Sequence, residues 1–557
     1  MSALAEESTR TLIDELLAEQ QQLTAVERFA RKHERDALPA QARYYRELIP
    51  LEKPQPGEQY AFAVDLDACT GCKACVSACH SLNGLDDDEI WRNVGLLHGG
   101  SSDAPYAQTI TTACHHCVEP ACLDGCPVRA YEKDEATGIV RHLDDQCIGC
   151  QYCVLKCPYD VPKYSAKKGI VRKCDMCQSR LAANEAPACV QACPTSAISI
   201  RVVSKSAVAA KSGDRLVPGA FDSDYTQPTT IYRTRKTIPA NARPGDATTL
   251  RMEHAHWPLI WMLVLTQAAA GIFLGAALLA LMAPAVFALA QAPLAASAFV
   301  LLNVGLAVSV LHLGRPLGAW RAFLGLRTSW MSREIFAFSF FAAAAGAFAT
   351  AALWPWLVAK LPLLPWIDSL VQPARFSPLL SGAAAALGLL GVFCSVMIYV
   401  DTRRAFWNAE SVSTKFFGTT LLLGAAGCAV VLAWQNFFSG AALGEAARVC
   451  TIVALVFRAG LFGWEATDLR RNLSGPSQRN HPSALIMWQL CRPLVIVRGG
   501  LIAGATLCGV LALTTGGVAG AIHATLSFVL TFAAQTIERY FFFTAVVAPR
   551  MPGGIAA

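Results

Sequence analysis

Sixteen cysteines between Cys69 and Cys193 fall into four groups of four, and their spacing is the strongest chemical signal in the sequence. The first and third groups share the form Cys-x2-Cys-x2-Cys-x3-Cys, whereas groups two and four have a longer gap before their third cysteine. The groups are Cys69, Cys72, Cys75 and Cys79; Cys114, Cys117, Cys122 and Cys126; Cys147, Cys150, Cys153 and Cys157; and Cys174, Cys177, Cys189 and Cys193.

This spacing favours cysteines that ligate iron–sulfur clusters, because thiolate sulfur is a soft ligand that suits them. Groups one and three match bacterial ferredoxins, in which three close thiolates hold one cluster and the fourth ligates a neighbouring cluster. Sixteen thiols suffice for four [4Fe–4S] clusters, and we therefore expect four. Zinc is the rival metal, since paired Cys-x2-Cys units build tetrahedral sites. The three-plus-one spacing, with a proline after three of the groups, favours iron–sulfur clusters.

The elements around these groups separate into a polar first part and an apolar second part, with the change near Trp257. Apolar residues make up 54% of the 557 residues and charged residues 16%, against about 45–50% and 25% in average soluble proteins. The net charge of +6 (47 − 41) is too weak and too dispersed to predict nucleic-acid binding.

The apolar part contains eight stretches that approach the roughly 20 residues needed to span a bilayer. They are 258–282, 293–314, 335–361, 377–400, 416–438, 448–465, 494–515 and 520–547. Loops on one side hold 11 Lys and Arg residues and those on the other side hold 3. By the positive-inside rule we expect a multi-pass protein of the cytoplasmic (inner) membrane, with the cysteine-rich head and both termini in the cytoplasm. Residues 1–35 show no secretory signal, which agrees with this expectation.

These patterns predict an α+β ferredoxin-like head with four iron–sulfur clusters and an all-α bundle of about eight transmembrane helices. Residues 1–59 are expected to form a helical arm that either docks on a partner or is a solvated extension. The apolar residues Leu12, Leu16, Leu23, Val26 and Phe29 recur along it, and Thr24 to Glu27 fits a capping box.

The head should occupy 60–201, with strands at 60–65, 139–142 and 198–203. Residues 202–252 read as a solvated connector, with Tyr232 and nearby basic residues at the membrane surface as the alternative. Residues 253–557 should form the membrane anchor with a quinone site.

The head resembles the four-cluster, ferredoxin-like subunits of the molybdopterin oxidoreductase family, which includes dimethyl sulfoxide reductase, nitrate reductase and formate dehydrogenase. The resemblance implies that group one pairs with group four, and group two with group three. The implied ligand sets are Cys69, Cys72, Cys75 and Cys193; Cys174, Cys177, Cys189 and Cys79; Cys114, Cys117, Cys122 and Cys157; and Cys147, Cys150, Cys153 and Cys126. Cys150 stands where nitrate reductases carry a tryptophan, so the pattern is more similar to dimethyl sulfoxide reductase.

The apolar part resembles the membrane-anchor subunit of the dimethyl sulfoxide reductase family. The specific stretch runs from His312-Leu313-Gly314-Arg315-Pro316 to Ser332-Arg333-Glu334. Head and anchor are separate chains in much of that family and are fused here. The dimethyl sulfoxide enzyme faces the periplasm, whereas the orientation expected here suits the related cytoplasmic sulfite dehydrogenases better.

Ionisable residues gather near the head-side ends of the apolar stretches, where burying them is expensive. A quinol releases two electrons and two protons, so its site needs a cluster nearby and a proton acceptor such as His or Glu. The resemblance implies that His312 lines this site, and we expect Arg333, Glu334, Glu538 and Arg539 to contribute to it. Snorkelling and helix-end ion pairing are the alternative explanation.

Two other features of the apolar part bear on cofactors. Arg458 lies deeper than the other ionisable residues and has no obvious partner in the sequence. Only His312 and His523 are placed to ligate haem, and they are expected near opposite faces of the membrane, so no haem is expected.

Together these features predict an electron-transfer and anchor subunit between a membrane quinone, either menaquinone or ubiquinone, and a molybdopterin catalytic subunit on a separate chain. No nucleotide or pterin fingerprint is present, so we expect no catalytic residues on this chain. The reaction is either sulfite oxidation or the reduction of a sulfoxide, nitrate or similar compound. A redox-driven ion-translocating subunit is the alternative. It requires polar residues through both membrane halves, and the sequence places them mostly in one half.

Overall fold

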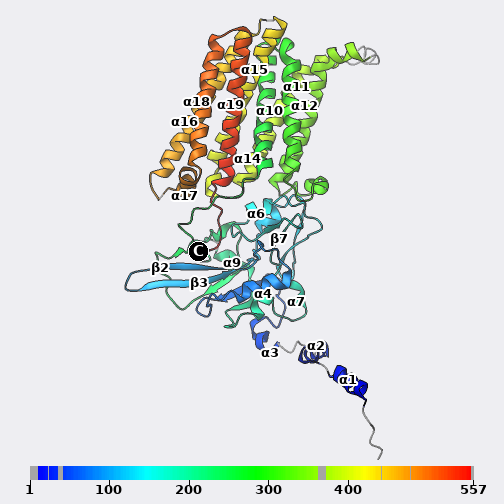
Figure 1. The fold of residues 1–557 in the computed structure, drawn as a ribbon, viewed down its shortest axis with the longest axis vertical. Helices are drawn as coiled ribbons and strands as arrows, with labels where there is room; N and C mark the ends of the chain where they lie inside the picture. Colours follow the sequence, from blue (N-terminus) through cyan, green and yellow to red (C-terminus); the bar gives the residue numbers. More distant parts are fainter. Residues whose placement is uncertain are drawn as a thin grey trace, which may run out of the picture.

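The computed structural model describes residues 11–22, 24–35, 42–211, 213–361, 372–440, 442–476 and 478–553. A helical bundle stands on a mixed α/β head, and two helices of the N-terminal arm extend away from the head (Figure 1). These are α1 (Leu12–Gln21) and α2 (Ala25–Arg35), and the capping box expected at Thr24 and Glu27 is formed. Leu23, part of the predicted apolar pattern, lies outside the described residues.

The head contains short, mostly antiparallel ladders joined by cysteine-bearing loops. One sheet has the order β8 (Ile198–Ser204), β1 (Glu58–Asp65) and β9 (Ile231–Arg233). A second contains β10 (Arg243–Pro244), β2 (Asn93–Gly100) and β3 (Pro105–Thr112). Two hairpins follow, β4 (Tyr131–Lys133) with β5 (Val140–His142), and β6 (Lys163–Ser165) with β7 (Ile170–Arg172). The three predicted strands are confirmed within two residues.

Short helices follow the cysteine loops. They are α4 (Ala74–Asn83), α5 (Ala121–Asp124), α6 (Tyr152–Lys156), α7 (Gln178–Ala182) and α8 (Ala188–Gln191). Before the first strand, α3 (Ala42–Tyr45) and the turn η1 (Arg46–Leu48) close the base of the head, with Tyr45 buried in its core.

The prediction that residues 202–252 form a solvated connector is wrong. After α9 (Lys205–Ala210) this segment supplies β9, which pairs in parallel with β1, and β10, which pairs with β2. Tyr232 is not at the membrane surface, because its hydroxyl donates to the carbonyl of Thr111 inside the head at 3.3 Å. Strands of two or three residues show no period in a sequence, which is why the pattern did not reveal them.

Among the residues that the structure describes, eight helices are long and apolar enough to cross a membrane, as predicted. They are α10 (Trp257–Met282), α11 (Pro284–Val310), α12 (Trp330–Lys360), α14 (Ser377–Val400), α15 (Ala409–Ser439), α16 (Gly444–Leu473), α18 (Arg492–Thr514) and α19 (Gly517–Thr544). The sixth, expected to be short, extends over 30 residues. The third begins at Trp330, so Arg333 and Glu334 lie in its first turns.

The eight helices form two groups of four, which we call the first bundle (α10, α11, α12 and α14) and the second bundle (α15, α16, α18 and α19). In Figure 1, α16, α18 and α19 of the second bundle stand to the left, and α17 (His481–Leu485) lies at their head-side end. The bundles meet mainly where α10 packs on α15. A Cβ on Gly271 would lie 2.0 Å from the carbonyl oxygen of Thr420, so the two backbones touch where glycine leaves room.

Candidate functional site

Two pockets in the head are each lined by four cysteines drawn from two different groups. One is lined by Cys69, Cys72, Cys75 and Cys193, and the other by Cys114, Cys117, Cys122 and Cys157. Gly71 allows the first loop to turn, because its φ is +73° and a Cβ there would lie 2.9 Å from the Thr109 methyl group. The Thr109 hydroxyl donates to the carbonyl of Cys69 at 2.7 Å and so holds the loop against β3.

The remaining eight cysteines form two further sets, which their electrostatic interactions reveal. Burial raises the pKa of Cys79 to about 12, and the neighbouring thiolates of Cys189 and Cys177 add to the rise. Cys174 interacts with Cys114 of the adjacent set and also with Cys79 and Cys177. Burial likewise raises the pKa of Cys126 to about 11, with a further contribution from Cys147.

Cys150 and Cys153 both interact with Cys126 and Cys147, which completes the last set of four. The structure therefore brings together the same four sets that the family resemblance implies.

These sets fit iron–sulfur clusters in their donor chemistry. All sixteen thiols are free of disulfides, and the donors are soft sulfur atoms. Within the described ranges, no three His, Cys, Asp or Glu side chains converge closely enough to share one metal ion. Four thiols around a wider space suit a cubane, whose irons each take one thiolate, better than a single zinc ion. The ligand role of each cysteine stays a prediction.

Two buried cations lie between the cysteine sets, and sequence reasoning missed both. The Arg92 guanidinium lies beside the thiols of Cys75, Cys79, Cys174 and Cys189. Burial opposes its charge, but the neighbouring thiolates raise the pKa of Arg92. Lys173 is also buried, and its ammonium lies 3.7 Å from the sulfur of Cys114. Such cations offset the negative charge that thiolate ligands bring into a protein interior. Lys173 directly precedes Cys174, whereas nothing in the sequence marks Arg92.

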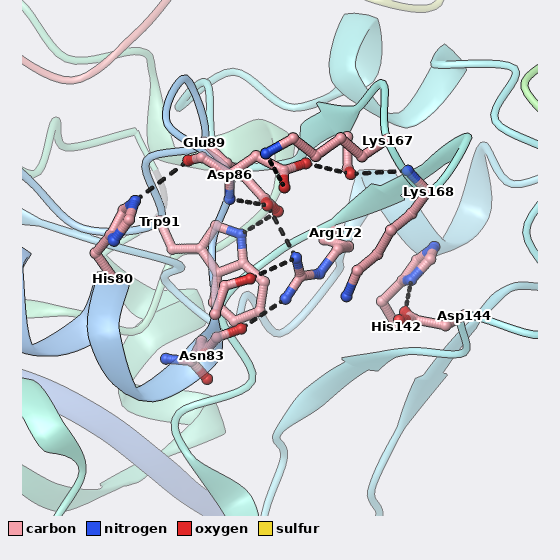
Figure 2. A network of polar contacts seen from close by, with 12 residues as sticks. His80, Asn83, Asp86, Glu89, Trp91, His142, Asp144, Lys167, Lys168 and Arg172 are labelled. Atoms are coloured by element: carbon pink, nitrogen blue, oxygen red, sulfur yellow. Dashed lines mark hydrogen bonds and ion pairs between the residues drawn. The ribbon is translucent and has the colours of Figure 1, made fainter.

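A buried polar network holds together the two segments that carry Cys79 and Cys174 (Figure 2). Arg172, at the end of β7, forms an ion pair with Glu89 at 3.0 Å and donates to the carbonyl of Asn83, at the end of α4, at 2.8 Å. The Trp91 indole donates to the same Glu89 carboxylate at 2.9 Å and stacks beneath the Arg172 guanidinium. This network fixes α4, which bears Cys79, against the hairpin that leads into Cys174.

The stretch His312 to Glu334 joins the head to the first bundle. We call the contact between residues 311–329 and the head the seam. The Arg315 guanidinium donates to the carbonyl of Asp144 at 2.8 Å, and that of Arg321 donates to the carbonyl of Asp145 at 2.7 Å. The Ser329 hydroxyl donates to the carbonyl of Gly125 at 2.7 Å. The stretch that carries the family resemblance therefore binds the loops next to Cys126 and Cys147 through these hydrogen bonds.

Three glycines let the backbones approach at this seam. A Cβ on Gly314 would lie 2.1 Å from the carbonyl oxygen of Gly169, and one on Gly149 would lie 2.9 Å from the nitrogen of Gly314. Gly149 and Gly169 also have positive φ angles, of +71° and +66°. Any side chain at these positions would separate head and bundle.

Helix α6 extends the contact into the base of the first bundle. The Tyr152 hydroxyl donates to the carbonyl of Ile398 at 3.1 Å, and Lys156 pairs with Asp401 at 2.6 Å. Cys150 packs against the apolar core of that bundle. The set of Cys126, Cys147, Cys150 and Cys153 is thus the set packed against the membrane helices.

His312 lies on the seam just beyond α11. Its Nδ1 contacts the carbonyl of Ser309, while its Nε2 is buried and finds no hydrogen-bond partner among the described residues. Burial lowers the pKa of His312, so the ring is neutral, with Nδ1–H donating and Nε2 free to accept. His256, at the start of α10, is close enough for the two rings to interact, and burial lowers its pKa to about 4. Sequence reasoning missed His256, whose position directly before Trp257 was the available signal.

The other residues expected at the quinone site lie in three different places. Glu334 is buried between α12 and α14 and accepts a hydrogen bond from the Ser395 hydroxyl at 2.5 Å. Arg333 donates to the carbonyls of Leu326 and Arg327 and stacks on a neighbouring indole, so it closes the turn before α12.

Glu538 and Arg539 lie on α19 in the second bundle, where they pair with one another and Glu538 also pairs with Lys415 at 3.0 Å. Arg539 reaches the Gln267 side chain on α10 at 2.9 Å. The ion-pair explanation describes this pair better than a shared site with His312.

Comparison with known families agrees with this organisation. Residues 106–203 match the 4Fe–4S dicluster domain, and residues 252–545 match the DMSO reductase anchor subunit (DmsC). The second match covers more than half of the chain.

Relatives of the head are iron–sulfur subunits. The B subunit of the anaerobic dimethyl sulfoxide reductase of Haemophilus influenzae is 36% identical over 188 residues, which are 32% of this chain and 91% of the relative. The corresponding B subunit of Escherichia coli is 34% identical over 200 residues, 34% of this chain and 94% of the relative. The formate dehydrogenase-O iron-sulfur subunit of E. coli is 34% identical over 158 residues, 25% of this chain and 52% of the relative. The chain belongs to the DMSO reductase anchor-subunit family and carries, fused to that anchor, an iron–sulfur electron-transfer domain of the same class of oxidoreductase.

Proposed function

We propose that this protein passes electrons between the membrane quinone pool and a molybdopterin-containing catalytic subunit on a separate chain. Substrate chemistry takes place on that partner, and this chain supplies the electron path and the attachment to the lipid membrane. The matches to an anchor subunit and to the B subunit of dimethyl sulfoxide reductase support this role. The partner's reaction is either sulfite oxidation, with electrons entering the quinone, or the reduction of a sulfoxide or nitrate by quinol.

Four [4Fe–4S] clusters are proposed, one for each cysteine set described above. When bound, they supply one-electron carriers that relay charge through the head. The chain's own contribution is to bury the thiols, to hold each set on loops from two groups, and to place Arg92 and Lys173 beside them. Iron analysis of anaerobically purified protein should return about sixteen irons per chain. A value near one iron or zinc per set would contradict the proposal.

The quinone site is proposed at the seam, next to His312. One observation carries this assignment: the unpartnered Nε2 of His312 lies on the same loop that grips the segments bearing Cys126 and Cys147. Quinol oxidation releases two electrons and two protons, and this chain supplies the bases for the protons. His312 Nε2 accepts one proton from a quinol hydroxyl, and His256, which interacts with His312, and the buried Glu334 are the candidates for the second.

The head and both termini are proposed to face the cytoplasm, because the loops on the head side hold most of the basic residues. The parts of the chain in this arrangement are the arm (1–59), the cluster domain (60–201), a segment that completes the head (202–252) and the anchor (253–557).

His312→Ala tests the quinone site directly. Quinone-linked turnover of the holoenzyme should fall at least about 100-fold, the scale of a lost general base, while cluster absorbance and turnover with an artificial redox dye stay unchanged. His523→Ala is the matched control, since His523 lies at the far end of α19, where it contacts the Thr515 hydroxyl. Unchanged quinone-linked turnover in His312→Ala would refute the site.

A further inference from the structure

The second bundle contains two cavities at opposite ends of the same four helices. The head-side cavity, of about 40 Å³, is lined by Lys415, Glu465, Asp468, Arg498 and Glu538 among others. The far-side cavity, of about 120 Å³, is lined by Asn436, Arg448, Thr451 and Thr515 among others. A water molecule needs about 10–15 Å³ of cavity volume, so each cavity has room for more than one. Polar side chains therefore line this bundle in both halves of the membrane, which the sequence alone did not indicate.

Arg458 stands between the two cavities. It is 4% exposed, and it lies seven residues along α16 from both Thr451 and Glu465. Seven residues are two helical turns, about 10 Å, so the guanidinium lies near the middle of the membrane. It donates to the Thr531 hydroxyl at 2.7 Å, to the Ser527 hydroxyl at 3.0 Å and to a backbone carbonyl of α18 at 2.9 Å.

A glycine makes room for this arginine. A Cβ on Gly509 would lie 3.0 Å from the Leu455 side chain, 3.3 Å from the Ser527 hydroxyl and 3.5 Å from the Arg458 guanidinium. The three helices α16, α18 and α19 therefore close tightly around one buried cation.

The head-side cavity holds polar groups whose hydrogen bonds are incomplete. The Arg498–Glu465 pair is 2.6 Å apart, yet the second oxygen of the Glu465 carboxylate is buried without a hydrogen-bond partner. Asn480 lines the same cavity, and its side-chain oxygen is also buried with no hydrogen-bond partner among the described residues. Buried polar atoms of this kind are satisfied by ordered water.

We propose that the second bundle forms a proton route: two water-filled cavities, open to opposite sides of the membrane, with Arg458 as the barrier between them. Protons fit this route better than metal cations. Two of the three carboxylates that line the head-side cavity are already paired with a cation, Glu465 with Arg498 at 2.6 Å and Glu538 with Lys415 at 3.0 Å. Carboxylates neutralised in this way attract a metal ion weakly, whereas water relays a proton without holding a cation. A fixed arginine in a narrow passage excludes protons, so the resting route is closed.

Passive proton flux tests the proposal without quinone or a partner subunit, so it can fail independently of the proposed function. The full-length, cluster-loaded chain is placed in phosphatidylethanolamine–phosphatidylglycerol vesicles with a pH dye inside, and a potassium diffusion potential is applied. The wild-type chain should conduct protons no faster than protein-free vesicles. Arg458→Ala should raise the flux several-fold, and adding Glu465→Gln should lower it again.

Arg470→Ala, an exposed arginine on the same helix, is the matched control and should leave the flux at the wild-type rate. Arg458→Ala protein that keeps its cluster absorbance and its elution volume but conducts at the lipid rate would overturn the proposal. A chloride flux without acidification in the same variant would overturn the identity of the ion.

A second measurement keeps Arg458 intact, in case its replacement prevents folding. Thr451→Cys should react with a membrane-impermeant maleimide only from the side away from the head, and Asp468→Cys only from the head side. Val453→Cys, on the outward face of α16, should stay unlabelled in the lipid. Failure of Thr451→Cys to react would show that the far-side cavity is closed to water and would overturn the route.

Discussion

The two bundles each have four helices, but they hold their buried carboxyl groups in different ways. The first bundle is attached to the head through the seam, and its buried carboxyl group, Glu334, has the Ser395 hydroxyl as its one hydrogen-bond partner among the described residues. The second bundle packs beside it and buries Lys415, Glu538 and Arg539 in one connected set of ion pairs. In the first bundle a carboxyl group is isolated next to the electron path, whereas in the second every buried carboxylate faces a cation.

The difference separates a carboxyl group suited to proton transfer, in the first bundle, from carboxylates held in ion pairs, in the second. A carboxyl group held only by a hydroxyl can gain or lose a proton without breaking an ion pair, which suits a partner for quinol. A carboxylate between two cations stays ionised and fixes its helices in place. The four variants below test this contrast, from the largest expected effect to the smallest.

Arg539→Ala should destabilise the protein most. Arg539 is fully buried and bonds to Glu538, Gln267 and Thr419, so its removal leaves Glu538 short of a partner. Breaking a buried ion pair costs about 3–5 kcal/mol. Thermal unfolding in detergent measures the loss, and Arg470→Ala should change stability by less than about 0.5 kcal/mol. Equal unfolding temperatures for the two variants would contradict the structural role of the ion pairs.

Glu334→Gln should affect turnover rather than folding. The amide keeps the hydrogen bond to Ser395 but cannot accept a proton. We expect quinone-linked turnover to fall about 100-fold, equal to about 2.7 kcal/mol in the barrier, with little change in unfolding temperature. A loss of stability as large as that of Arg539→Ala, with normal turnover, would remove the distinction between the bundles.

Gly314→Ala should separate the first bundle from the head. The new methyl group would overlap the carbonyl oxygen of Gly169, and overpacking of this kind costs about 1–3 kcal/mol. Quinone-linked turnover should fall together with the unfolding temperature, whereas dye-linked turnover of the head should persist. Gly382→Ala on α14 is the control, because nothing lies within 4 Å of its Cβ position. If both variants behave alike, the seam does not depend on glycine.

Trp434→Phe should have the smallest effect. Its indole donates to the Thr525 hydroxyl at 2.9 Å in the far half of the second bundle. A neutral hydrogen bond contributes about 0.5–1.5 kcal/mol, less than the ion pairs near the head. Trp356→Phe, an exposed tryptophan on α12, provides the comparison in unfolding experiments. A loss equal to that of Arg539→Ala would mean that stability is spread evenly along the second bundle.

The sequence predicted those features that have a regular pattern. The cysteine spacing identified all sixteen thiols of the four sets, and apolar runs identified eight spanning helices. The role of Arg92 could not be predicted, because its neighbours come together only after four cysteine loops have folded. The partners of Arg458 lie 47 to 73 positions further along the chain, so no local pattern indicates them.

The placement of the ionisable residues was only partly predictable. The sequence places these residues near the head-side ends of the helices. It does not show that the helices carrying them belong to different bundles, so it did not predict that the residues would lie apart. Glu334 lies early in its span and Glu538 lies late in its span, so both are at the head side, yet α12 and α19 belong to different bundles. Which carboxylate finds a cation depends on tertiary packing, which hydropathy does not record.

The glycine contact at the seam also determines how the protein is assembled. The loop that presents His312 has no regular helix or sheet of its own beyond a short 3₁₀ turn at 316–323, and it rests on the backbone of Gly149 and Gly169. A polypeptide whose third cysteine loop is misfolded gives this segment nothing to lie against. On the proposed function, such a defective copy would leave the proposed quinone site unformed, and so would not take electrons from the quinone pool when it has no clusters to receive them.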